Sequence, residues 1–251
     1  MTRFSANLGF LWTDRPLPDA IHAAHAAGFA AVECHWPYET PASDVRAALD
    51  ATGLPMLGLN TVRGQVGENG LAALHGRETE ARAAIDQAIA YADAVDAQAI
   101  HVMAGFAKGE AARDTFETNL TYATAQTDRT ILIEPLNRHD APGYFLETTG
   151  QAHEIMSRVD APNLKLMFDC YHVGRTEGDV MTRLGDLLPL IGHIQFAAVP
   201  DRGAPDHGEL NYTAIFGHIS SLGWTAPLGA EFKPRDPDAP LRWMQSQSLL
   251  A

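Results

Sequence analysis

Residues 130–134 read TILIE, a short run of β-branched and apolar residues that ends in a carboxylate. A run of this kind predicts a buried β-strand with Glu134 at its carboxyl end. Similar runs recur along the chain and alternate with longer, alanine-rich segments whose apolar residues fall at helical spacing. This alternation is typical of repeated strand–helix units around a parallel sheet.

Eight strands are predicted, with helices in the gaps between them. The strand ranges are Arg3–Asn7, Ala30–Cys34, Met56–Asn60, Ala99–Met103, Thr130–Glu134, Leu164–Asp169, His193–Ala197 and Leu228–Phe232. The segment Glu78–Val95 shows the helical pattern, because Ala81, Ile85 and Ala88 share one face while Arg82 is left for solvent. With a length of 251 residues and 46% apolar content, eight units predict a single (β/α)8 TIM barrel domain over residues 1–251.

An open, doubly wound sheet is the alternative arrangement of such units. It has less support, because no G-x-G-x-x-G motif follows the first predicted strand and no P-loop occurs. We therefore expect no nucleotide cofactor.

Charge and composition argue against several classes of partner. The formal net charge is −13, and the three lysines form no basic cluster that could neutralise a run of phosphates, so nucleic acid is not expected to bind. No stretch of about 18 apolar residues occurs, and residues 1–18 lack the features of a signal peptide. We expect a cytoplasmic location, no membrane contact and a small-molecule substrate. Cys34 and Cys170 are expected to be free thiols.

Four predicted strands have a polar residue at, or within two residues of, their carboxyl ends, namely Glu134, Asp169, Gln195 and Glu231. The carboxyl ends of the strands form the active-site face of a TIM barrel. Each residue alone is explained as well by a solvated strand end. Three carboxylates at one barrel mouth, however, would repel one another unless a cation binds between them. A set of oxygen donors without cysteine predicts one divalent metal ion, Mg²⁺ or Mn²⁺.

Motifs at these strand ends carry a family resemblance. They are Ile133-Glu134-Pro135-Leu136-Asn137, Phe168-Asp169-Cys170-Tyr171-His172, Gly192-His193-Ile194-Gln195, Gly208-Glu209-Leu210-Asn211-Tyr212 and Glu231-Phe232-Lys233-Pro234. With this combination the chain resembles the hydroxypyruvate isomerases, within the broader xylose isomerase-like group of TIM barrels, over nearly its whole length.

The resemblance implies roles for individual residues. The metal ligands would be Glu134, Asp169, Gln195 and Glu231, and two of these, Glu134 and Glu231, would be the catalytic acid and base. The residues expected to contact substrate are His172, Arg202 and Lys233. Asn137 and Glu209 are expected to orient the site from behind the metal ligands.

The expected reaction interconverts hydroxypyruvate and tartronate semialdehyde (2-hydroxy-3-oxopropanoate). A proton leaves the hydroxymethyl carbon and another is returned to the neighbouring carbon, through an enediolate. Two glutamates suffice for both steps, and either could be the base. Charge that develops on the enediolate oxygens would be stabilised by the metal.

The loops depart from the family pattern and leave the substrate open. The glycine-rich segment Thr61–Gly76 predicts a long loop that could cover the site, but residues 61–70 contain no tryptophan, and Trp12 could replace the lost aromatic surface.

Other functions remain open at this point. A 2-oxo-tetronate isomerase would use the same groups, whereas a ketose 3-epimerase commonly has histidine in place of Gln195. A three-metal phosphodiester nuclease would need more histidine ligands and a basic face. From another class, the barrel could bind a sugar acid without catalysis. A homo-oligomer is compatible with the sequence.

Overall fold

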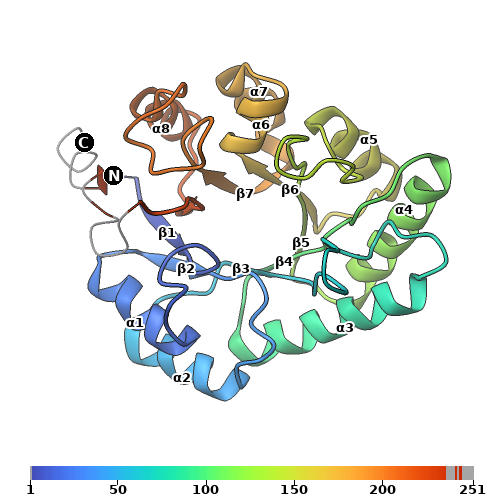
Figure 1. Ribbon diagram of the computed structural model, residues 1–251, viewed down its shortest axis with the longest axis horizontal. Helices are drawn as coiled ribbons and strands as arrows, with labels where there is room; N and C mark the ends of the chain where they lie inside the picture. The colour runs from blue at the N-terminus through green and yellow to red at the C-terminus, as the bar shows by residue number, and fades with distance from the viewer. Residues whose placement is uncertain (1, 236–240, 242, 245–251) are drawn as a thin grey trace.

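Eight parallel strands form a barrel in the computed structural model of the chain, which describes residues 2–235, 241 and 243–244 (Figure 1). The strands are β1 Phe4–Asn7, β2 Ala31–Glu33, β3 Gly58–Asn60, β4 Ala99–His101, β5 Thr130–Ile133, β6 Leu164–Asp169, β7 Ile191–Phe196 and β8 Leu228–Ala230. They pair in the order β2-β1-β8-β7-β6-β5-β4-β3. Between β2 and β3 the barrel closes where the Leu57 N–H donates to the Val32 carbonyl at 2.7 Å. The predicted TIM barrel is confirmed.

Helices surround the barrel on its outside (Figure 1). Their bounds are α1 Leu17–Ala26, α2 Ala42–Thr52, α3 Glu78–Val95, α4 Glu110–Gln126, α5 Thr149–Val159, α6 Cys170–Thr176, α7 Val180–Leu187 and α8 Tyr212–Ser221, with a 3-10 turn at Leu188–Leu190. Helix α3 has the predicted bounds and buries the predicted face. None of the described helices combines the length and the apolar character needed to cross a membrane.

Side-chain alternation along the strands separates two apolar layers. Ile131 and Ile133 of β5 point outward into the main core, which lies between the barrel and its helices. Leu132 points the other way and joins Ala99 and Met167 in a small cluster within the barrel. This inner layer lies beneath the polar residues at the carboxyl ends of the strands.

Candidate metal centre and active site

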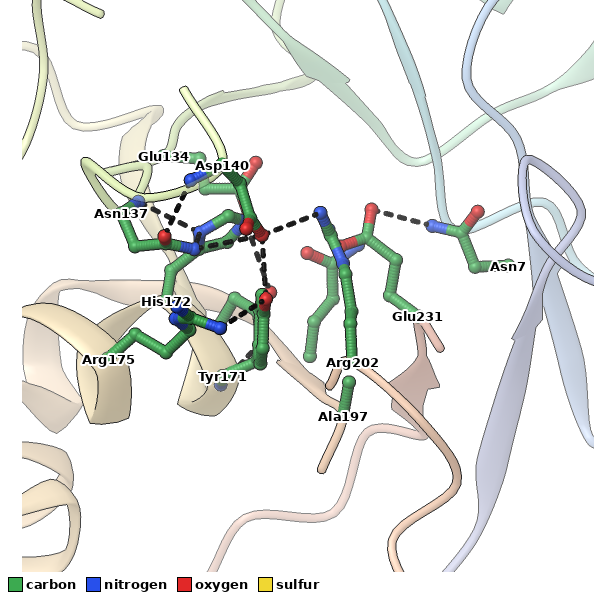
Figure 2. A network of polar contacts seen from close by, with 12 residues as sticks. Asn7, Glu134, Asn137, Asp140, Tyr171, His172, Arg175, Ala197, Arg202 and Glu231 are labelled. Atoms are coloured by element: carbon green, nitrogen blue, oxygen red, sulfur yellow. Dashed lines mark hydrogen bonds and ion pairs between the residues drawn. The ribbon is translucent and has the colours of Figure 1, made fainter. Parts of the chain in front are cut away.

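The four polar residues predicted at strand ends all lie at the carboxyl end of the barrel. Asp169 is the last residue of β6 and pairs in register with Gln195 of β7, while Glu134 and Glu231 directly follow β5 and β8. Their exposed fractions are only 1% to 5%. Glu134, Asp169, His172 and Glu231 each bring a potential ligand atom to within 4.8 Å of the others. Figure 2 shows Glu134, His172, Arg202 and Glu231 converging.

The predicted metal ligands present oxygen atoms that the protein does not use. Glu134 Oε1, Asp169 Oδ2 and Gln195 Oε1 are buried, and none has a hydrogen-bond partner among the described residues. Buried polar atoms without a partner are costly, by about 1–3 kcal/mol each. Three such oxygens, beside the carboxylate of Glu231, fit a divalent cation that prefers oxygen donors.

The electrostatics of the carboxylates also fit a bound cation. Burial and the negative charge of Glu231 raise the pKa of Asp169 to about 8. Burial and the charges of Glu231 and Asp169 raise the pKa of Glu134 well above its ordinary value. For Glu231, burial acts in the same direction, but Arg202 and His35 outweigh it and hold the pKa low. A bound cation would let all three carboxylates ionise together.

The imidazole of His172 faces the carboxylate cluster. Its Nδ1 accepts from the backbone N–H of Asn137 at 2.9 Å and from the Asn137 side-chain amide at 2.8 Å. Burial and the nearby Arg202 charge lower the pKa of His172 to about 3, so the ring is neutral. The proton then resides on Nε2, which lies 3.6 Å from Asp169 Oδ2. In this tautomer Nε2 carries the proton and is a donor, whereas Gln195 Oε1 is a buried oxygen without a hydrogen-bond partner among the described residues.

Arg202 reaches the cluster from the loop between β7 and α8. Its guanidinium forms an ion pair with Glu231. The same group lies 4.7 Å from the ring centroid of Phe10 and 5.1 Å from that of Tyr171, which fixes it between two aromatic faces. Its backbone adopts a left-handed conformation, φ 56°, and its carbonyl accepts from the Lys233 N–H at 2.7 Å.

A cavity of about 350 Å³ opens over these groups. Glu134, His172, Arg202 and Glu231 line it, together with Phe10, His35, Trp36, Asn60, Arg63, Asn69 and His101. Arg63 and Asn69 belong to the long loop predicted after the third strand, so that loop does contribute to the site. A larger cavity of about 990 Å³ lies elsewhere, between α4 and α5, and contains none of the predicted site residues.

Three other predicted site residues lie in different surroundings. Asn137 is fully buried, and its side-chain amide donates to His172 Nδ1 and, at 3.2 Å, to Asp140 Oδ2. Lys233 and Glu209 are exposed and do not belong to the lining of the 350 Å³ cavity. Trp12 packs against Phe29 instead of facing the site, and the aromatic surface there comes from Phe10 and Trp36.

Several further residues lie close to the carboxylate cluster. His35 Nε2 lies 3.0 Å from Glu231 Oε1, and Asn7 Nδ2 donates to the same oxygen at 3.2 Å (Figure 2). Neither ring nitrogen of His101 has a hydrogen-bond partner within the described part of the chain, and its Nδ1 lies 3.7 Å from Glu134 Oε2. Glu33 at the end of β2 could have been found by the strand-end rule that identified Glu134.

Comparison with known proteins places this geometry in a family. The family model described as Xylose isomerase-like TIM barrel matches residues 21–251. A 2-oxo-tetronate isomerase of Cupriavidus necator is 43% identical over 98% of both chains. A Danio rerio protein assigned as a hydroxypyruvate isomerase is 40% identical over 97% of this chain and 94% of its own. These relatives confirm the expected enzyme class, an isomerase.

Solved structures agree on the fold. A Brucella melitensis structure titled AP endonuclease, family 2, has a TM-score of 0.94 at 35% identity and covers 98% of this chain and 99% of its own. An E. coli 3-keto-D-glucoside 4-epimerase has a TM-score of 0.80 at 19% identity, over 100% of this chain and 98% of its own, which shows the shared fold alone. The chain belongs to the xylose isomerase-like TIM barrel family.

Proposed function

We propose that the protein is a metal-dependent isomerase that moves a carbonyl group between C2 and C3 of a small 2-oxo-3-hydroxy acid. The observation that carries this proposal is the set of buried, unpartnered oxygens on Glu134, Asp169 and Gln195 beside Glu231. Two of these residues, Glu134 and Glu231, line a cavity of about 350 Å³ that a small acid can enter.

The residues have complementary tasks in this reaction. A divalent cation held by the four side chains would supply Lewis-acid polarisation of the substrate's adjacent carbonyl and hydroxyl oxygens. Glu134 and Glu231 face the site from β5 and β8, with β6 and β7 between them. One glutamate removes the proton from the carbon that bears the hydroxyl, and the other returns a proton to the neighbouring carbon. The Nε2–H of His172 donates to an oxygen of the enediolate.

Two arginines give the cavity the charge that an acid requires. Arg202 is paired with Glu231, whereas Arg63 has no carboxylate partner among the described residues. The Arg63 guanidinium lies 4.5 Å from the ring centroid of Trp36, and both residues line the cavity. We therefore assign the substrate carboxylate to Arg63, which lines the cavity, in place of Lys233, which was expected from the sequence but does not line it.

Two substrates fit this chemistry. The four-carbon 2-oxo-tetronate is favoured, because the relative of that name is 43% identical over nearly the full length of both chains. Hydroxypyruvate, the three-carbon acid expected from the sequence, is the second candidate, supported by relatives at 38–40% identity. A phosphodiester nuclease has less support, since a net charge of −13 opposes a polyanionic substrate.

Steady-state kinetics on chelator-treated protein, with Mn²⁺ or Mg²⁺ restored, would test the proposal. We expect turnover only with metal, and a larger kcat/KM for 2-oxo-tetronate than for hydroxypyruvate. A larger kcat/KM for hydroxypyruvate would make hydroxypyruvate the favoured substrate and 2-oxo-tetronate the second candidate. The proposal would be contradicted if complete removal of the metal left the turnover of either acid unchanged. It would also be contradicted if the metal-loaded protein turned over neither acid.

A further inference from the structure

Glu33 is a buried carboxylate to which the proposed reaction gives no task. It ends β2, is 4% exposed and lies within the barrel below the metal-facing groups. Its Oε1 accepts from the Gln195 side-chain amide at 2.7 Å and from the Asn7 amide at 3.0 Å. Its Oε2 lies 2.6 Å from Nε2 of His193. Both carboxylate oxygens are therefore engaged by other side chains.

An ionised carboxylate can only accept hydrogen bonds, and this decides which way the Gln195 amide faces. The NH₂ end of the amide is taken by Glu33, so the oxygen end points away from it. That oxygen, Gln195 Oε1, is buried without a partner. We propose that Glu33 is a positioning residue that holds Gln195 with its amide oxygen toward the metal, an inference that rests on the metal centre of the proposed function.

The same carboxylate also supports a second metal-facing group. The Nδ2 of Asn7 bridges Glu33 Oε1 and Glu231 Oε1, and it donates to the latter at 3.2 Å. The contact of Asn7 with Glu231 is seen in Figure 2. Partners of this kind, which bind metal ligands from behind, typically change metal affinity by roughly 10- to 100-fold when they are replaced. Glu33 thus connects β2 to ligands on both β7 and the end of β8.

Gly229 of β8 provides the space for this arrangement. A Cβ atom at that position would lie 2.7 Å from Glu33 Oε1 and 2.8 Å from both His193 Nε2 and the Cγ of Gln195. These separations are shorter than non-bonded atoms tolerate, so any larger residue would displace the carboxylate or its partners. By contrast, a Cβ at Gly58 of β3 would meet its nearest atom, the Ala99 carbonyl oxygen, at an ordinary 3.5 Å.

Mn²⁺ binding, measured by the electron paramagnetic resonance signal of the free ion, tests the role of Glu33 without relying on catalysis. In Glu33→Gln the side chain can donate as well as accept, so Gln195 can turn its nitrogen toward the metal. We expect the Kd for Mn²⁺ to rise roughly 10- to 100-fold, while the unfolding midpoint shows that the protein is folded. Gly229→Ala should weaken Mn²⁺ binding in the same direction, and the matched strand variant Gly58→Ala should not.

The exchanged pair Glu33→Gln/Gln195→Glu is the decisive variant. It reverses donor and acceptor, keeps the net charge and presents a carboxylate oxygen to the metal in place of the amide oxygen, so we expect it to recover most of the affinity lost in Glu33→Gln. Wild-type affinity in Glu33→Gln, or no recovery in the exchanged pair, would overturn the role of Glu33 and leave the metal centre intact. Absence of Mn²⁺ binding by the wild type would instead refute the metal centre itself, and with it this inference.

Discussion

The carboxyl of Asp169 links metal binding to pH. Its pKa is raised from 3.8 to about 8, so the folded, metal-free protein retains a proton that the unfolded chain has already released. Because the folded state binds more protons in this interval, the free energy of unfolding falls as pH rises from about 4 to about 8. Metal binding would displace that proton and so remove this loss of stability at higher pH.

We therefore predict that Mn²⁺ raises the unfolding temperature more at about pH 8 than at about pH 5.5. Differential scanning calorimetry at saturating Mn²⁺, with chelated protein as reference, measures both gains. In Asp169→Asn, which has no titrating group at this position, the difference between the two pH values should shrink. Equal gains at both pH values in the wild type would show that the buried carboxyl does not titrate as described.

Binding of the negatively charged substrate carboxylate should depend on Arg63. Replacing a cation that hydrogen-bonds a carboxylate costs about 1.5–3 kcal/mol, so Arg63→Gln should raise KM for 2-oxo-tetronate roughly 10- to 100-fold. We expect kcat and the Kd for Mn²⁺ to change little, because Arg63 does not contact the metal-facing groups. Arg46→Gln, which removes one positive charge from the outer helix α2, is the matched control. An unchanged KM in Arg63→Gln would show that a group other than Arg63 binds the substrate carboxylate.

The loop after β3, residues 61–77, is held against β4 by its backbone. The Ala72 N–H donates to the Met103 carbonyl at 3.2 Å, and the Gly70 N–H donates to the Arg63 carbonyl at 2.8 Å. A Cβ on Gly70 would lie 2.4 Å from the Met103 carbonyl oxygen, which only glycine avoids. The position of Arg63 therefore depends on this close approach.

Gly70→Ala should displace the loop and raise KM for the acid, with Mn²⁺ affinity retained. Gly67→Ala is the matched control, since Gly67 also has a positive φ of 90° but its Cβ would meet nothing within 4 Å. Kinetics on both variants and Mn²⁺ titrations measure the effect. If the two variants have the same KM, contact with Met103 does not position the loop.

Regular elements were predictable from the sequence, and loop geometry was not. Each predicted strand lies within about two residues of an observed one, because apolar runs and strand ends are encoded locally. The strand-end rule found Glu134, Asp169, Gln195 and Glu231 for the same reason. Their role as metal ligands stays a prediction.

Side-chain positions in the loops depend on long-range contacts, which could not be predicted from the sequence. Arg63 faces the cavity only because its loop packs on Met103, more than 30 residues away in the chain. The contact of Trp36 with Arg63 likewise joins two separate loops. Lys233 follows Glu231 by two residues, but the chain has left β8 at Ala230, so strand alternation no longer directs its side chain.

At the scale of the whole molecule, the barrel joins the first and last strands of the chain. Phe196 of β7 lies at this seam, with its ring 5.7 Å from Phe4, 5.0 Å from Phe216 and 5.4 Å from Trp243, measured between centroids. It is fully buried. The aromatic cluster therefore packs β1, β7 and α8 together beneath the loop that carries Arg202.

Phe196→Ala should lower the free energy of unfolding by about 3–5 kcal/mol, the usual cost of removing a buried phenylalanine ring. Urea unfolding followed by circular dichroism measures the change, with Phe106→Ala, at a 40% exposed residue, as the control. A loss below about 1 kcal/mol in Phe196→Ala would mean that the seam does not depend on this ring.

Proton transfer between carbon atoms through two glutamates is the central claim, and turnover in ²H₂O tests it most directly. Proton NMR of the products formed by metal-loaded wild type, Glu134→Gln and Glu231→Gln follows both the rate and the fate of the hydrogen. We predict that the wild type incorporates solvent deuterium at the carbon that receives the proton, and that each variant loses at least about 100-fold in kcat. Turnover that carries the original hydrogen from one carbon to the other without deuterium, or a variant of either glutamate with wild-type kcat, would contradict the account.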